Sequence, residues 1–372
     1  MEQKEGEPMR KVKVGIVGCG NISSIYLQNL NQRFKTVEVN AVADLVPERA
    51  KAQADQYHVP RVLETQALIA DPDIDIVLNL TIPKAHADVC RQALMAGKHT
   101  YVEKPLSISL EDGMMLAQLA EEKNLLLGGA PDTFMGAGIQ TCLQLIQQGV
   151  IGQPIGATAF MTCHGHESWH PDPEFYYQVG GGPMFDMGPY YLTALFALLG
   201  PARRVTGSTA ISFPQRTITS EKKNGQIIDV EVPTHVAGIL DMSNGAVATI
   251  LTSFDVWHAN LPFIEIYGSK GTLSVPDPNT FGGPVKLRLA GEDQFKEVPI
   301  TRPYAENSRG LGVADMARAV NAGTKDHRAS GSLTSHVLEA MHGFHIASDE
   351  NRHHLMKTTF KQPDAVADQE IY

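Results

Sequence analysis

The sequence of 372 residues has little cysteine, no excess of positive charge and no long apolar run. Its few cysteines lie far apart without CxxC spacing, which excludes a disulfide framework and favours a reducing compartment; they are Cys19, Cys90, Cys142 and Cys163. Lys and Arg number 31 against 41 Asp and Glu, so the net charge is -10 and no basic patch marks a nucleic-acid or membrane surface. No segment of about 18 uncharged apolar residues is present, and the polar N-terminus lacks the apolar region of a signal peptide. We therefore expect a cytoplasmic protein that acts on a small molecule.

The hydrophobic pattern changes near residue 130. Before this point, short apolar runs alternate with helical patterns, as in βαβ units with a parallel sheet. The expected strands are 12–17, 37–43, 76–80, 100–102 and 125–127, and the expected helices are 22–34, 47–57, 85–96 and 110–122.

After residue 130, longer strand patterns dominate. The expected strands are 155–163, 204–213, 235–242, 246–257, 263–267 and 285–289, with helices at 139–147, 312–321 and 333–348. Asn244-Gly245 predicts a type I′ hairpin, which needs positive φ at both positions, and the glycines at 268 and 271 predict a second hairpin turn. We predict an α/β protein: a Rossmann dinucleotide-binding domain over residues 1–130, then an α+β domain with an open, largely antiparallel sheet over 131–372.

A glycine-rich loop follows the first strand and opens the first helix, the context in which a G-x-G-x-x-G match predicts dinucleotide binding. The first glycine permits the tight turn, and the second lets the backbone approach a pyrophosphate at the helix N-terminus. Ser23 replaces the third glycine and is small enough for close packing. Asp44 ends the second strand near the spacing of ~20 residues for an acid that binds a ribose 2′-hydroxyl, which favours NAD over NADP, although Arg49 nearby softens this preference. The expected cofactor contacts here are Gly18, Gly20, Asn21, Ile22 and Asp44.

Two further strand ends carry candidate contacts. Ligands of open parallel sheets bind at the carboxyl ends of strands, so we expect Thr81, Pro83 and His86 to border the nicotinamide half of the cofactor. The next strand ends in Glu103-Lys104-Pro105. A lysine here can orient a substrate hydroxyl and stabilise negative charge on its oxygen, so Glu103 and Lys104 join the predicted site. Taken alone, His86 also fits a surface histidine, and Lys104 fits an ion pair.

These motifs together resemble the glucose-fructose oxidoreductase / inositol dehydrogenase (Gfo/Idh/MocA) family over nearly the whole chain. The resemblance implies a Rossmann domain plus an open-sheet α/β domain, and NAD(P)-dependent oxidation or reduction of sugars, inositols or related polyols. It also implies that Lys104 lies beside the reacting carbon. The segments that carry it are residues 14–21, Thr81-Ile82-Pro83 with His86, Ala96-Gly97-Lys98-His99, Glu103-Lys104-Pro105, and Gly180-Gly181-Gly182 followed by Asp186-Met187-Gly188.

One departure from the family pattern bears on mechanism. Many members place a catalytic His four residues after Asp186, where this sequence has Tyr190. Some sugar ketoreductase-like members look similar and use Tyr as the acid/base, so the resemblance assigns catalysis to Lys104, Asp186 and Tyr190. A spacing of four predicts that both side chains share one helical face. Lys104 can lower the tyrosine pKa of ~10, as a base near neutral pH requires. Simple packing of Tyr190 is the alternative.

Three histidines lie close together in the second half: His164, His166 and His170. An H-x-H pair on a strand points both imidazoles to one face, as in metal sites, but no further ligand has diagnostic spacing and we predict no metal. We expect a polar substrate-binding wall of His164, His166 and His170 with Trp169, whose ring can stack on a sugar. A plain surface loop is the alternative.

The leading hypothesis is an NAD(P)-dependent dehydrogenase or reductase of a cyclic sugar or polyol. Two alternatives stay open: an NAD-dependent glycosidase that oxidises its sugar transiently, and a non-catalytic NAD-binding sensor. An open antiparallel sheet face needs covering, so we also expect a homodimer or homotetramer formed through the second domain.

Overall fold

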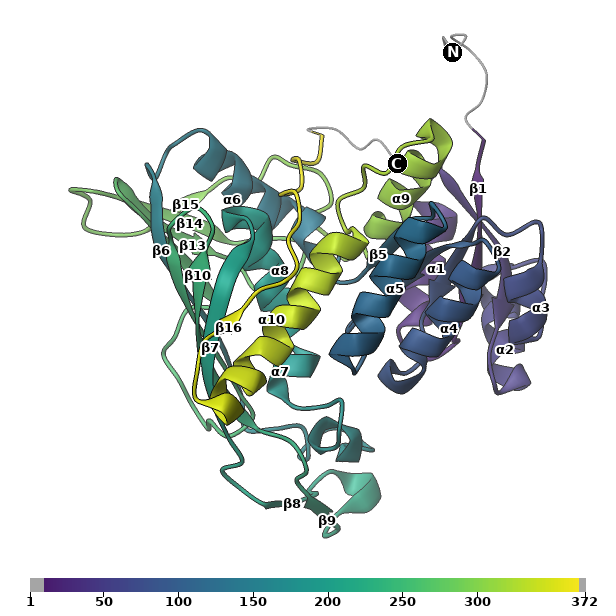
Figure 1. The fold of residues 1–372 in the computed structure, drawn as a ribbon, viewed down its shortest axis with the longest axis horizontal. Coiled ribbons are helices and arrows are strands. Elements are labelled where there is room, and N and C mark those ends of the chain that lie inside the picture. Colours follow the sequence, from purple (N-terminus) through teal and green to yellow (C-terminus); the bar gives the residue numbers. More distant parts are fainter. Residues whose placement is uncertain (1–9, 368–372) are drawn as a thin grey trace.

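The computed structural model describes residues 10–367, which form two large sheets with helices around and between them (Figure 1). The first sheet is parallel and the second is mixed but largely antiparallel. The predicted α/β fold class is therefore confirmed. Among the described residues, no helix combines the length and the apolar composition needed to cross a bilayer.

The first sheet has five parallel strands in the order β2-β1-β3-β4-β5. Its strands are β1 Val12–Val17, β2 Val37–Ala43, β3 Ile76–Asn79, β4 His99–Val102 and β5 Leu127–Gly129. Val62 adds a parallel bridge outside β2, so counting it gives the six-position order of dinucleotide-binding sheets. The order reverses between β1 and β3, and the carboxyl ends of these two strands define the edge where such sheets bind ligands.

Helices connect the parallel strands as the periodicity predicts. They are α1 Ser23–Gln32, α2 Pro47–Tyr57, α4 Pro83–Met95 and α5 Leu110–Glu122, together with α3 Thr65–Ala70. The short α3 was not predicted, because six residues give too little periodicity to detect. The prediction for β5 began two residues early: Leu125 bonds back to Ala120 at the end of α5, so the strand starts only at Leu127.

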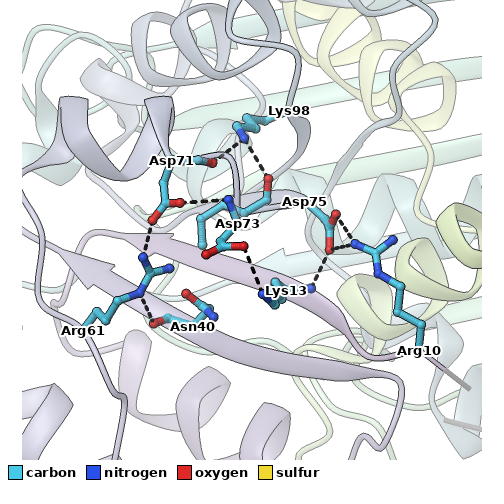
Figure 2. Close-up of polar contacts among 9 residues, drawn as sticks. Arg10, Lys13, Asn40, Arg61, Asp71, Asp73, Asp75 and Lys98 are labelled. Carbon is cyan, nitrogen blue, oxygen red and sulfur yellow. Dashed lines mark hydrogen bonds and ion pairs between the residues drawn. The ribbon is translucent and has the colours of Figure 1, made fainter. Parts of the chain in front are cut away.

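A polar network fixes the opposite edge of this sheet, where the strands begin (Figure 2). Lys98, buried before β4, donates to the carbonyls of Asp71 and Ile74 at 2.5 and 2.9 Å. Asp75 accepts from the backbone of Lys13 at 2.9 Å and pairs with Arg10 at 2.6 Å. These contacts hold the loop before β3, so Lys98, one of the motif residues, serves the fold rather than the ligand-binding edge.

The second sheet has nine strands in the order β15-β14-β13-β12-β6-β11-β10-β7-β16. Within the described part of this second sheet, β6 and β11 pair in parallel and all other neighbours pair antiparallel. The strands are β6 Pro154–Thr162, β7 Ala202–Ala210, β10 His235–Met242, β11 Val247–Ser253, β12 Ile264–Gly268, β13 Gly271–Val275, β14 Val285–Leu289, β15 Lys296–Val298 and β16 His354–Leu355, and β8 Gln215–Thr217 pairs separately with β9 Ile227–Asp229.

The hairpin between β10 and β11 forms where predicted, but its turn differs from the prediction. Gly245 has φ +92°, whereas Asn244 is not among the residues with positive φ. Gly245 donates its N–H to the carbonyl of Met242, and the Asn244 side chain bonds to Ala246 N and Leu199 O. These bonds hold Asn244 in a right-handed turn, so type I′ was wrong. The second predicted hairpin turn, between β12 and β13, is confirmed.

The helices of the C-terminal half connect the two sheets. They are α6 Ala137–Gln147, α7 Pro183–Asp186, α8 Gly188–Leu199, α9 Leu311–Ala322 and α10 Gly331–Glu350, with short 3₁₀ turns at Thr133–Met135, Glu174–Tyr177 and Glu221–Lys223. Helix α10 contacts β7 and α8 on one side and α5 and β5 on the other (Figure 1). Helix α9 packs on β1 and β5, so the chain returns to the first sheet near its end. We keep residue 130 as the proposed domain boundary.

Candidate active site

The glycine-rich loop joins β1 to α1 at the ligand-binding edge of the first sheet. Gly18 has φ +102°, and a Cβ there would lie 2.6 Å from the carbonyl group of Leu80. The protein's own packing therefore requires this glycine. Gly20 differs, because a Cβ there would meet nothing within 4 Å. Gly20 thus leaves open space before the N-terminus of α1, which fits the close approach of a dinucleotide pyrophosphate.

Two side chains stabilise this loop. Ser23 is fully buried and donates its hydroxyl to the Gly20 carbonyl at 2.6 Å, which explains how a serine fits at the third glycine position. Asp44, directly after β2, accepts from the backbone N–H of Cys19 at 2.7 Å and from that of Val46 at 2.8 Å. Each Asp44 oxygen holds one backbone donor, and a carboxylate retains acceptor capacity for a ribose hydroxyl. Asn21 is exposed and Ile22 half-buried beside it.

The loop after β3 carries the next predicted contacts. Thr81 donates its hydroxyl to the side chain of Asn79 at 2.6 Å, and Pro83 opens α4. His86 is buried: its Nδ1 lies 2.6 Å from the Pro105 carbonyl and its Nε2 lies 3.0 Å from the Thr81 carbonyl. Both ring nitrogens thus face backbone carbonyls, and His86 links the Thr81 loop to the loop of Lys104. Its predicted place beside the nicotinamide stays a prediction.

An ion pair between the two sheets forms the centre of the site. Lys104 follows β4 and donates to the carboxylate of Asp186 at 2.9 Å and to its backbone carbonyl at 2.8 Å. The Lys104 Nζ also lies 5.4 Å from the centre of the Tyr190 ring. The structure therefore brings together all three residues that the resemblance proposed for catalysis.

The helix that was expected to carry Asp186 and Tyr190 is interrupted. Asp186 ends α7, and α8 begins at Gly188 with Pro189 in its first turn. The expectation of one shared helical face was therefore wrong: Pro189 has no N–H to continue the α7 ladder, so the chain restarts at Met187. Lys104 brings the two residues together instead, because it donates to Asp186 and lies over the Tyr190 ring.

Electrostatics keep this pair ionised. Burial lowers the pKa of Lys104, but the Asp186 carboxylate and Tyr190 raise it more, so its pKa lies well above the usual value. Burial raises the pKa of Asp186, but Lys104 and His166 together lower it by more than burial raises it. The net pKa of Asp186 therefore lies well below the usual value. Burial raises the pKa of Tyr190, and although Lys104 and Arg309 oppose this, the net pKa is raised. In the free protein Tyr190 thus keeps its proton at neutral pH.

Glu103 directly follows β4 and is buried beside Lys104. Its buried carboxylate accepts from the Tyr26 hydroxyl at 2.8 Å and from the Lys104 backbone N–H at 2.9 Å. Both oxygens are thereby engaged with the protein. This places Glu103 as a support for Lys104.

The predicted histidine wall divides into two groups. Strand β6 ends at Thr162, so His164 and His166 lie in a loop with Gly165 at φ +75° between them, and the strand geometry of an H-x-H pair does not apply here. His164 stacks on Trp257 at 3.4 Å between ring centres. His166 faces Asp186, with Nε2 3.4 Å from its carboxylate.

The other two members of the wall lie beyond His166. Trp169 is 61% exposed with its ring 5.3 Å from that of His166, and His170 packs its edge against Trp169 and Tyr176. Among the described residues, no group of three His, Cys, Asp or Glu side chains is placed to hold a metal ion. Only His166 of the wall reaches the ion pair.

Arg309 is a site residue that the sequence did not reveal. It lies just before α9, is held by Asn279 at 2.8 Å and Asn307 at 2.9 Å, and lowers the pKa of Tyr190 through its charge and a hydrogen bond. No motif surrounds it, and only the return of the chain to the first sheet brings it to Tyr190. No sequence signal was available for it.

The glycine loop, the strand order and the placement of Asp44 define a dinucleotide-binding protein. Family models agree: residues 12–129 match the Gfo/Idh/MocA "Oxidoreductase family, NAD-binding Rossmann fold", and residues 139–274 match the Gfo/Idh/MocA C-terminal domain. The chain belongs to this Gfo/Idh/MocA family.

Individual proteins resemble the chain over most of its length or over a part of it. A dTDP-3,4-didehydro-2,6-dideoxy-alpha-D-glucose 3-reductase of Saccharopolyspora spinosa is 30% identical over 335 residues, covering 85% of this chain and 93% of that protein. Inositol 2-dehydrogenase of Salmonella paratyphi B is 36% identical over 152 residues, covering 39% of this chain and 44% of that protein. A levoglucosan dehydrogenase in complex with NADH and levoglucosan has the same fold, with a TM-score of 0.78 at 20% identity, covering 94% and 100% of the two chains.

The two loop glycines provide a matched pair of substitutions. Gly20→Ala is expected to leave the melting temperature unchanged, because the added Cβ meets nothing, but to weaken NADH binding about tenfold or more by blocking the pyrophosphate. Gly18→Ala is expected to destabilise the fold by about 1–3 kcal/mol, because of its positive φ and the clash with Leu80. Thermal melting and fluorescence titration with NADH measure both effects. Wild-type NADH affinity in Gly20→Ala would contradict the assignment of this loop.

Proposed function

We propose that the protein transfers a hydride between a nicotinamide and one CH–OH carbon of a cyclic sugar or polyol. The observation that carries this proposal is the position of the Lys104 ammonium against both the Asp186 carboxylate and the Tyr190 ring. Several relatives named as sugar reductases or inositol dehydrogenases support the class of substrate.

Lys104 is the group that polarises the reacting oxygen in this proposal. An ammonium has three donors, and Asp186 takes two of them with its carboxylate and its backbone carbonyl. The remaining N–H is available to a substrate oxygen, where it stabilises the negative charge that develops as C–O becomes C=O or the reverse. Asp186 holds the ammonium in place and is free to accept from a neighbouring hydroxyl.

Tyr190 moves the proton. Because burial raises its pKa, Tyr190 is protonated at neutral pH and can donate to the alkoxide oxygen when a ketone is reduced. In the oxidation direction it must first lose this proton, and the charges of Lys104 and Arg309 favour that loss. Bound NAD⁺ supplies the hydride acceptor at its nicotinamide ring. We also propose that NAD is preferred over NADP, because the Asp44 carboxylate repels a 2′-phosphate.

Removal of the Tyr190 hydroxyl tests this role. Once a panel of inositols, hexoses and keto-sugars identifies a substrate by NADH absorbance, Tyr190→Phe is expected to lower kcat by roughly 10²–10⁴, the scale of positioned proton transfer. The melting temperature should change little, because the ring is kept. Tyr191→Phe removes a hydroxyl from the neighbouring buried tyrosine and serves as the matched control with unchanged kcat.

A stable Tyr190→Phe enzyme with the wild-type kcat would overturn the assignment. Release of a leaving group from a glycoside without net formation of NADH would identify transient oxidation instead of a dehydrogenase. These two outcomes are independent, since the first concerns the residue and the second the reaction.

We further propose that the second sheet mediates assembly into a homodimer or homotetramer. Burial alternates along β10 and β11, so one sheet face is exposed, while helices contact this sheet through α6, α7, α8 and α10. The exposed face carries Ile239 at 42% and Val247 at 48% exposure on these neighbouring strands. Such apolar side chains favour burial against a second copy.

Light scattering tests this assembly. The unmodified protein is expected to have two or four times the chain mass of 40.4 kDa, and the double variant Ile239→Lys/Val247→Lys a lower mass. Val62→Lys, an equally exposed apolar position beside the first sheet, should leave the mass unchanged. A mass near 40.4 kDa for the unmodified protein would rule out the assembly.

A further inference from the structure

His166 occupies a buried position beside the ion pair that the proposed reaction does not yet use. His166 is 8% exposed. The centre of its ring lies 4.0 Å from the ring centre of Tyr176 and 4.7 Å from that of Phe254. The aromatic contacts come from two separate segments of the chain, so the ring has a fixed orientation.

The orientation of the ring directs Nε2 at Asp186. Nε2 lies 3.4 Å from Oδ2 of Asp186, while Oδ1 of the same carboxylate accepts from Lys104 at 2.9 Å. The carboxylate thus lies between two nitrogen donors, one on each oxygen. A donor on each oxygen fixes the carboxylate plane, and with it the position of the Lys104 ammonium.

The backbone of His166 is anchored independently of its ring. Its N–H donates to the Tyr177 hydroxyl at 3.3 Å. That hydroxyl donates in turn to Glu167, whose other oxygen accepts from buried Arg216 at 2.9 Å. Both Glu167 oxygens thus have donors in this network, which holds the loop in position. The His166 ring takes no part in it and faces Asp186.

The charged state of His166 follows from its neighbours. Burial lowers its pKa, but the hydrogen bond and charge of Asp186, with smaller contributions from Cys163 and the Gly165 backbone, raise it to about 9. The other titratable groups that face it are Tyr176, Tyr177 and Glu167. The Glu167 carboxylate forms an ion pair with Arg216, which compensates its charge. The ring is therefore an imidazolium at neutral pH and becomes neutral as the pH rises through about 9.

We infer that His166 is a positioning residue of the reaction centre, whose N–H holds the Asp186 carboxylate against Lys104 and whose deprotonation at alkaline pH weakens this hold. The kinetic part of the inference rests on the proposed function, because it acts through Lys104. The structural part, the pairing of protonated His166 with the Asp186 carboxylate, does not depend on any substrate.

The pH dependence of kcat tests the kinetic part. With the unmodified protein and NADH, kcat for the reduction of an identified keto-sugar is expected to fall about tenfold above a midpoint near pH 9. In His166→Gln this fall should disappear, because the Gln side chain can donate to Asp186 but does not titrate. His164→Gln is the matched control: it lies two residues away, stacks on Trp257, and should keep the fall at the same pH.

Nuclear magnetic resonance of the histidine side chains tests the structural part without substrate or cofactor. In the unmodified protein, the side chain of His166 should titrate with a pKa of about 9. Asp186→Asn should lower this pKa by at least about 1, because the carboxylate charge is lost.

The outcomes separate the inference from the proposed function. An alkaline fall that persists unchanged in His166→Gln, or a His166 that titrates at or below about 6.5, would overturn the role of His166 even if sugar oxidoreduction is correct. The expected His166 titration together with failure of every sugar and polyol would support the pairing and overturn the proposed substrate class. If His166→Gln has too little activity for a pH profile, the resonance measurement decides alone.

Discussion

The ion pair between Lys104 and Asp186 is the interaction on which the rest of the site depends. Lys104 follows a strand of the first sheet, and Asp186 ends a helix that contacts the second. Loss of Asp186 would leave the largely buried charge of Lys104 without its carboxylate, a cost of several kcal/mol. The pair therefore aligns the two halves of the molecule as well as the groups that we propose to react. Tyr190 lies against Lys104, His166 faces Asp186, and Arg309 interacts with Tyr190.

The sequence predicts the first half of the fold well because its signals are local. The runs at 12–17 and 37–43 match β1 and β2, and 47–57 and 110–122 match α2 and α5. These strands are largely buried and rich in apolar residues, and these two helices are long enough to show their period. The glycine loop is equally local, because a strand, a turn and a helix N-terminus follow one another directly in the chain.

The parts that the sequence could not predict depend on distant contacts. His166 reaches Asp186 because α7 is packed between the loop after β6 and Lys104, and Arg309 reaches Tyr190 because α9 returns to the first sheet. His86 has the right sequence context for a ligand contact, yet both of its ring nitrogens lie within hydrogen-bond distance of backbone carbonyls. Spacing alone also failed at Met187, where a proline divides one expected helix into two. In each case tertiary packing decided the orientation of a side chain.

The most direct test of the account is a crystal structure of the protein with NADH. The central claim is that Lys104 and Tyr190 stand at the reactive end of the cofactor, whose pyrophosphate lies at Gly20. The nicotinamide C4 is therefore expected to face the space between Lys104 Nζ and the Tyr190 hydroxyl, leaving about 3–3.5 Å for contact with a substrate carbon. A nicotinamide that turns away from both side chains, with its pyrophosphate still bound at Gly20, would contradict the claim.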